Sequence, residues 1–165
     1  MLILAVDPHV RHMAYAVVNV EAERVLGVGT VRAPKGLTQQ GCQDYWHGYA
    51  MNPSLVDKDD VSGGACHLAI EIPDHLKNRS NKQLQDLVAL AMCVSAFCQG
   101  WSRKIRTYDQ VQPRDWKGRA TKERTRMEVL AACGRKAKKW TEHQTDAAAL
   151  GLWWCRNAKG KSFTT

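Results

Sequence analysis

Three acidic residues and one histidine lie at positions where a functional role accounts for a charged or polar side chain better than exposure to solvent does. Asp7 ends an apolar run of five residues, and Glu71 ends a second apolar stretch. His143 and Asp146 are three residues apart, so they share one face of a helix. An ionised carboxylate at the end of a buried strand is costly unless a cation compensates it. The chemistry that this set favours is therefore the binding of a cation by carboxylates.

Each of these residues also has an ordinary explanation. Asp is frequent at strand ends as a turn former, and a histidine at a helix start is commonly structural or solvated. Asp146 would also interact favourably with the helix dipole. The combination is more specific than its members, because Asp7 lies on the first predicted strand and Glu71 on the fourth, while a His-x-x-Asp sequence opens the last predicted helix.

Five strands are predicted to position the first two acids. Residues 2–6 are apolar on both faces, which is typical of a central strand. Residues 14–20 and 25–31 follow with short connections, so the first three strands are predicted to form an antiparallel meander. Residues 67–72 and 103–108 are predicted as the fourth and fifth strands.

Four helices are predicted, over residues 38–50, 80–98, 121–133 and 141–157. The second and fourth open with capping boxes at Ser80–Gln83 and Thr141–Gln144, and the third ends at Gly134. Ala147–Ala149 are small enough to let the last helix approach the sheet closely. Three strands, then strand–helix–strand, then helices predict an α/β sheet flanked by helices.

The helix predicted over residues 80–98 is apolar nearly all round. One face carries Leu84, Leu87, Val88 and Ala91, and another carries Leu90, Val94 and Phe97. A surface helix of a monomer needs only one such stripe. We therefore expect the Leu90–Phe97 face to be covered by a partner subunit, which predicts a homodimer through this helix.

Length and composition limit the class of protein. The chain has 165 residues, 44% hydrophobic and 24% charged, which suits a single domain over residues 1–165. No apolar run reaches the ~20 residues of a membrane helix, and the N-terminus has no basic leader. The six cysteines form no Cys-x-x-Cys pair, so reduced core thiols are expected rather than a zinc site. We expect a cytoplasmic protein without a membrane partner.

The positive charge is concentrated in one quarter of the chain. The net charge is +8, and residues 101–140 contain thirteen Lys and Arg against four Asp and Glu. The remainder of the chain is therefore close to neutral. A confined basic block indicates a polyanion-binding face, although a solvated basic surface would show the same pattern.

Several short segments resemble the RuvC-type Holliday-junction resolvases of the ribonuclease H-like superfamily, in particular a compact, phage-type member. Ile3–Pro8 followed by Tyr15–Val17 resembles the opening of these resolvases, and Leu68–Glu71 resembles their second acidic motif. His143–Leu150 resembles their closing helix, and Pro113, Lys117 and Lys122 resemble the basic segment between the two. The resemblance covers most of the chain apart from residues 34–66.

The resemblance implies a five-stranded ribonuclease H-like mixed sheet with its first strand central. Asp7, Glu71, His143 and Asp146 would converge at one end and bind two Mg²⁺ (or Mn²⁺) ions per active site. In that arrangement Asp7 would bridge the ions, while Glu71 and Asp146 would flank them. His143 would be a further ligand or would orient the attacking water.

The resemblance also implies a substrate, namely branched DNA with four arms. The activity would be that of a crossover junction endodeoxyribonuclease, working near the nucleoid or in the cytoplasm of a phage-infected cell. The residues expected to hold DNA are Lys77, Asn78, Arg114, Lys117, Arg119 and Lys122. The chain departs from these resolvases at Asp74, where they carry an aromatic residue.

Three other functions are compatible with these residues. A ribonuclease H or a broader flap and branched-DNA nuclease of the same fold would share the metal site and differ in substrate. A basic DNA-binding module without catalysis is the third alternative. The acids argue against the last, because a pure binder gains nothing from carboxylates that repel phosphate.

Overall fold

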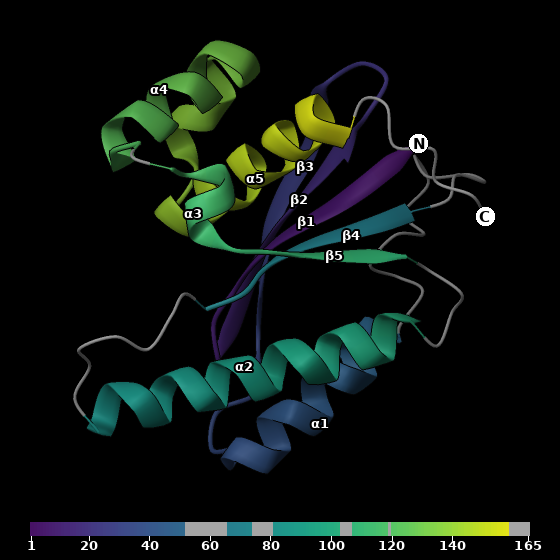
Figure 1. Ribbon diagram of the computed structural model, residues 1–165, viewed down its shortest axis with the longest axis vertical. Helices are drawn as coiled ribbons and strands as arrows, with labels where there is room; N and C mark the ends of the chain where they lie inside the picture. The colour runs from purple at the N-terminus through teal and green to yellow at the C-terminus, as the bar shows by residue number, and fades with distance from the viewer. Residues whose placement is uncertain (52–65, 74–80, 103–106, 119, 159–165) are drawn as a thin grey trace.

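The apolar N-terminal segment forms the centre of a five-stranded mixed sheet (Figure 1). The computed structural model describes residues 1–51, 66–73, 81–102, 107–118 and 120–158. Every residue of β1 (Leu2–Pro8) is buried, as expected for a strand that is covered on both faces and paired on both edges. The sheet confirms the predicted fold class and the central place of the first strand.

The strand order is β3-β2-β1-β4-β5. The elements beside β1 are β2 (His12–Asn19), β3 (Arg24–Arg32), β4 (Cys66–Glu71) and β5 (Tyr108–Val111). Strands β1, β2 and β3 pair antiparallel, which confirms the predicted meander. Strand β4 runs parallel to β1, and β5 runs parallel to β4.

The fifth strand lies further along the chain than predicted. It was expected over residues 103–108, but β5 begins at Tyr108, and residues 103–106 are outside the described part of the chain. The segment is only weakly apolar, and tertiary partners satisfy its polar side chains. The Trp154 indole donates to Asp109 Oδ2 at 2.8 Å, and the Gln110 amide lies 3.9 Å from Cys98 Sγ. Such partners do not show in a local apolar pattern.

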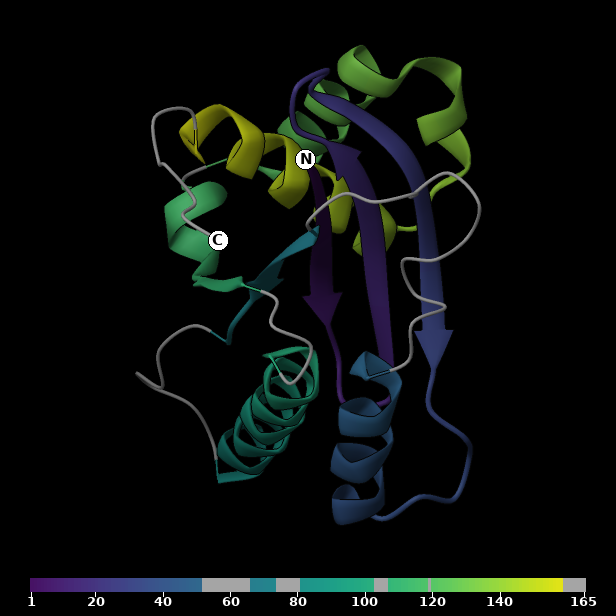
Figure 2. The ribbon, with the colours of Figure 1, turned by 90° about the vertical axis from the view of Figure 1, so that its right-hand side faces the viewer.

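Helices cover both faces of the sheet (Figures 1 and 2). On one face lie α1 (Gln39–Ala50) and α2 (Asn81–Ser102). On the other lie α3 (Pro113–Trp116), α4 (Lys122–Cys133), the 3-10 helix η2 (Gly134–Lys139) and α5 (Glu142–Ala158). Thr38 and Thr121 cap α1 and α4, and α4 ends at Gly134 with a positive φ, so these predicted boundaries are confirmed.

The prediction that the Leu90–Phe97 face of α2 is covered by a partner subunit is wrong. Val94 and Phe97 are buried in the core between the sheet and α1, and Leu90 packs against that core. The prediction overlooked that α1 packs along α2 and, together with the sheet, covers this side of the helix. The outer face of α2 instead exposes Val88 and Met92, at 52% and 43%.

Helix α2 is also the one described helix that is long and apolar enough, by length and composition, to cross a membrane. Its segment Gln83–Trp101 has a mean hydropathy of 1.2. A core helix of a soluble protein passes the same test, and α2 buries Cys93, Val94 and Trp101 against the sheet and α1. The finding is therefore weak support for a membrane span.

Candidate active site

The two strand-borne acids are neighbours because of the register between β1 and β4. Val6 pairs with Ile70 in parallel, so the next step along both strands brings Asp7 beside Glu71. Alternation sends both side chains to the face that α5 covers, since Ile3 and Ala69 pack into the core on that face. The Asp7 side chain is 10% exposed and that of Glu71 14%.

Helix α5 brings the histidine and the third acid to the same end of the sheet. The predicted capping box is present, since Thr141 N donates to the Gln144 amide oxygen and Gln144 N donates to Thr141 Oγ1. His143 Nδ1 lies 2.7 Å from Asp7 Oδ2. Asp146, one turn further along, has a side chain that is 17% exposed.

Small residues let α5 lie close enough to the sheet for these contacts. Ala147 and Ala148 are fully buried, as the sequence predicted. Gly151 allows the closest approach, because a Cβ built on it would lie 2.6 Å from Val18 Cγ2 and 3.2 Å from Ala5 Cβ. These distances are shorter than ordinary carbon–carbon contacts of ~3.5–4.0 Å.

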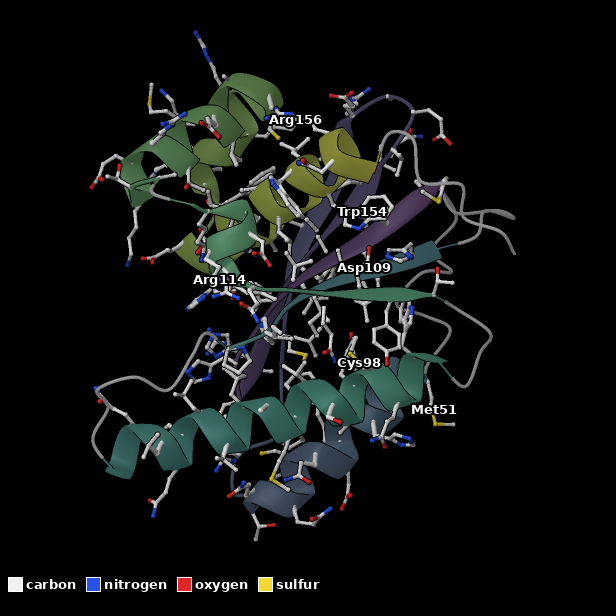
Figure 3. The ribbon with its side chains drawn as sticks, in the orientation of Figure 1. Met51, Cys98, Asp109, Arg114, Trp154 and Arg156 are labelled. Carbon is white, nitrogen blue, oxygen red and sulfur yellow. The ribbon has the colours of Figure 1, made fainter. Side chains whose placement is uncertain are left out.

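The far end of α5 is held by a polar network on β4 and β5. Asp109 and Trp154 point toward one another in Figure 3, joined by the 2.8 Å indole hydrogen bond. Buried His67 lies 3.2 Å from Asp109 Oδ2 through Nε2 and 2.7 Å from Thr107 Oγ1 through Nδ1. The helix is therefore fixed at both ends, which sets the position of His143 and Asp146.

The lysine that follows α3 lies between two of the acids. Lys117 Nζ is 2.8 Å from Asp146 Oδ2 and 3.3 Å from Glu71 Oε2. Its neighbour Trp116 donates its indole N–H to Glu71 Oε2 at 2.8 Å, and the ammonium lies 4.6 Å from the centre of that ring. Trp116 thus orients Glu71 while Lys117 compensates both carboxylates.

Burial dominates the electrostatics of the strand-borne acids. Desolvation raises the pKa of Asp7, against the lowering effect of the contact with His143. Desolvation likewise raises the pKa of Glu71, and the charge of Lys117 only partly opposes it. Burial lowers the pKa of Lys117, but the hydrogen bond to Asp146 and the charge of Glu71 outweigh it, so this pKa is raised. The cluster is short of positive charge.

The donor set fits a divalent cation. Three carboxylates face one ammonium, which leaves a net charge of −2 while His143 is neutral. Hard carboxylate oxygens are the ligands that Mg²⁺ and Mn²⁺ prefer. Among the described residues no three His, Cys, Asp or Glu side chains are placed so that they could hold a metal ion together. Lys117 lies between Glu71 and Asp146. The ligand set therefore stays a prediction.

The other predicted DNA-binding residues lie in different places. Arg114 projects from α3 with a side chain that is 59% exposed (Figure 3). Lys122 begins α4 and pairs with Glu142, the first residue of α5. Lys77, Asn78, Arg119 and the departure at Asp74 lie outside the described residues.

Sequence reasoning missed two histidines and one tryptophan near the acids. His9 and His12 stack with ring centres 4.4 Å apart, and the His12 ring lies 5.1 Å from that of His143. The predicted hairpin could have indicated this histidine pair, because the turn between β1 and β2 places His9 opposite His12. No local pattern indicated that Trp116 would reach Glu71.

The chain combines a five-stranded mixed sheet flanked by helices with a carboxylate cluster, formed by Asp7, Glu71 and Asp146, at one end of that sheet. No protein-family model and no curated protein sequence matches the chain. Solved structures do match it. RuvC of Thermus thermophilus superposes with a TM-score of 0.72 at 19% identity, covering 96% of this chain and 97% of that one.

Two structures determined with DNA also match. RuvC of T. thermophilus in complex with a Holliday-junction substrate gives a TM-score of 0.71 at 18% identity, over 95% of this chain and 96% of that one. The fowlpox virus resolvase in complex with Holliday-junction DNA gives 0.54 at 14% identity, over 95% and 98%. The chain thus has the fold of RuvC, as the sequence resemblance implied.

Proposed function

We propose that this protein is a structure-selective endodeoxyribonuclease that resolves four-way DNA junctions, leaving 5′-phosphate and 3′-hydroxyl ends. The observation that carries the proposal is the gathering of Asp7, Glu71 and Asp146 at one end of a RuvC-like sheet. Lys117 contacts Glu71 and Asp146 there, and His143 contacts Asp7. Excess negative charge at a partly buried position disfavours phosphate unless cations are present. A nuclease site has that requirement, and a simple DNA-binding surface does not.

Asp7, Glu71 and Asp146 would hold two Mg²⁺ or Mn²⁺ ions. Bound divalent ions supply Lewis-acid stabilisation of the charge that develops on the scissile phosphate, and they activate water as the nucleophile. Trp116 holds the Glu71 carboxylate in place through its 2.8 Å hydrogen bond. Lys117, released from the carboxylates, would contact a phosphate oxygen.

His143 has a position suited to handling a proton. Its Nδ1 lies 2.7 Å from Asp7, and its side chain is 49% exposed. A ring held by a buried carboxylate on one side and open to solvent on the other can orient water and accept its proton. Service as a direct metal ligand is the alternative role for this residue.

The test of the activity is a comparison of substrates. Four-way junction, flap, duplex and RNA–DNA hybrid are incubated with Mg²⁺ or Mn²⁺ and the products are resolved by gel. We expect paired nicks in the junction. Cleavage of the hybrid in preference would favour a ribonuclease H, and equal cleavage of flaps would favour a broader branched-DNA nuclease.

Asp7→Asn is the variant that tests the site. Removal of one carboxylate should abolish cleavage and leave junction binding intact or tighter, because the repulsion of phosphate falls. Asp44→Asn is the matched control, since Asp44 is an exposed carboxylate on α1, on the opposite face of the sheet. Cleavage by Asp7→Asn within about tenfold of the wild-type rate would contradict the assignment.

DNA binding by the basic segment is tested by its salt dependence. Arg114, Lys117 and Lys122, and the predicted contacts Lys77 and Arg119, would each release counterions from phosphate, whereas Asn78 would contribute an uncharged hydrogen bond. Several such contacts lower affinity by roughly 10³-fold or more between 50 and 200 mM salt. An affinity that hardly changes over this range would show that the basic segment faces elsewhere.

Two opposed nicks in a two-fold symmetric junction require two related active sites, so we propose a homodimer. The outer face of α2 is the candidate interface, because it exposes Val88 and Met92. Replacing both by Glu should yield monomers that nick singly. Leu26→Glu, at an exposed apolar position on β3, is the control. An unchanged dimer in sedimentation would place the interface elsewhere.

A further inference from the structure

A cavity of about 260 Å³ opens beside the carboxylate cluster, between the beginnings of α4 and α5. Asp146 belongs to both, since it lines the cavity and contacts Lys117 in the cluster. Three charged residues line the α4 side: Lys122, Glu123 and Arg126. Trp140, which precedes α5, contributes an aromatic ring. The cavity therefore lies next to the place where the scissile phosphate would be held.

The aromatic ring is firmly placed. Trp140 is half-buried and packs against the core cluster that includes Val129 and Ala137. Its backbone N–H donates to Ala137 O at 3.2 Å. One part of the ring is thus held by the core while the ring still lines the cavity, an arrangement that offers a rigid stacking surface.

The charged residues around this ring indicate which kind of ligand the cavity would bind. Arg126 forms no ion pair within the part of the chain that the structure describes, whereas Lys122 is paired with Glu142. The carboxylates of Glu123, Glu142 and Asp146 would repel an isolated phosphate. Glu123 and Glu142, which are not proposed as metal ligands, would accept hydrogen bonds from an exocyclic amino group, as carboxylates do from cytosine. An aromatic face, one unpaired guanidinium and several acceptors together fit a nucleotide better than a free anion.

We propose that this cavity holds one unpaired nucleotide of the strand being cut, with its base on Trp140 and its phosphate at Arg126. The inference rests on the proposed junction cleavage and names a substrate contact within it. About 260 Å³ equals the volume of roughly nine waters, which is space for one base. Extruding a base costs least where it is already unpaired, and a nucleotide next to the branch point has a neighbouring base pair on one side only within its own arm.

The test is a double-mutant cycle between the protein and the DNA. Junctions carry an abasic site at each nucleotide flanking the branch point in turn, and affinity is measured in Ca²⁺. Trp140→Ala should weaken binding of the intact junction by about 5- to 150-fold, the range of base–aromatic stacking. At one nucleotide the abasic substitution should cancel that loss. Equal losses on all junctions would overturn the proposal.

Further variants keep the test decisive where Trp140→Ala fails to fold. Trp140→Phe retains a ring and should keep most of the affinity and the same cycle. Arg126→Gln should reduce the salt slope by about one on the intact junction. Trp153→Phe changes a half-buried tryptophan on α5 that does not line this cavity and is the control. A Trp140→Phe protein without coupling to any nucleotide would also overturn the proposal.

A crosslinking experiment gives an independent answer. 5-Iodouracil placed at the nucleotide found in the cycle should crosslink to Trp140 and not to Trp153. Crosslinks elsewhere on the chain would refute the assignment. Wild-type protein that cuts the junction without this coupling would overturn only the nucleotide site. Protein that neither binds nor cuts the junction would overturn the proposed function itself.

Discussion

Gly151 sets the distance between α5 and the sheet, and Gly151→Ala should disturb both stability and the site. The added Cβ would lie 2.6 Å from Val18 Cγ2, so the helix must retreat by about 1 Å to reach ordinary contact. Val18 cannot yield easily, because it is fully buried and its branched side chain is restricted at χ1. Overpacking of this kind costs about 1–3 kcal/mol.

The intrinsic preference of the helix opposes that cost. Ala is favoured over Gly in a helix interior by about 1 kcal/mol, so the net loss should be about 0–2 kcal/mol. Gly48→Ala on α1 isolates this contribution, since nothing lies within 4 Å of a Cβ built there. We expect Gly48→Ala to stabilise the protein by about 0.5–1 kcal/mol. The two variants should therefore differ by about 1–3 kcal/mol in urea unfolding.

The same shift would reach the site. Asp146 lies five residues before Gly151 on the same rigid helix, and a misplacement of ~1 Å can cost about 10²-fold in rate. Gly100→Ala separates the two effects, because its Cβ would meet His47 O at 2.3 Å between α1 and α2, away from the acids. It should destabilise the fold while folded protein still cleaves junctions. Gly151→Ala with the stability of Gly48→Ala and the wild-type cleavage rate would refute this reasoning.

Three further predictions concern charge and thiols. Lys117→Met removes the ammonium between two carboxylates, so the variant should melt at a lower temperature than wild type in EDTA, and Mg²⁺ should restore its melting temperature. A melting temperature that does not respond to Mg²⁺ would contradict the metal site. Because burial raises the pKa of Asp7 in the folded protein, its protonated form stabilises the fold fully below the unfolded value of 3.8. That stability is lost as the pH rises above 3.8 and through the raised folded pKa, so Asp7→Asn should melt higher than wild type in EDTA at pH 7 but not below about pH 4. Burial raises the pKa of Cys98 and Cys155 to about 11. In native protein at pH 8 a thiol reagent should therefore react faster with half-buried Cys133 than with these two buried thiols. Fast reaction of Cys98 or Cys155 would show that α2 or α5 opens.

The sequence alone predicted those strands and helix starts that depend on neighbouring residues in the chain. The apolar run before Asp7 predicted a central strand, since burial on both faces removes any need for alternation. Capping residues such as Thr121 and Thr141 predicted where helices begin, because their side chains bond to backbone within the same turn. Asp7 and Glu71 were proposed as site residues from equally local signals, because each follows an apolar run, and His143 and Asp146 because a spacing of three residues places them on one face of a helix.

Contacts between distant segments were decided only by the tertiary structure. The helix over residues 80–98 had two apolar faces, and composition could not say which one α1 and the sheet would cover; Phe97 proved to be core and Val88 exposed. The polar strand β5 could not be predicted from its own residues, because Asp109 accepts its hydrogen bond from Trp154 on α5. Lys117 and Trp116 reach Glu71 across more than forty residues of chain. A side chain's partner depends on where the whole backbone places it, and no local pattern carries that information.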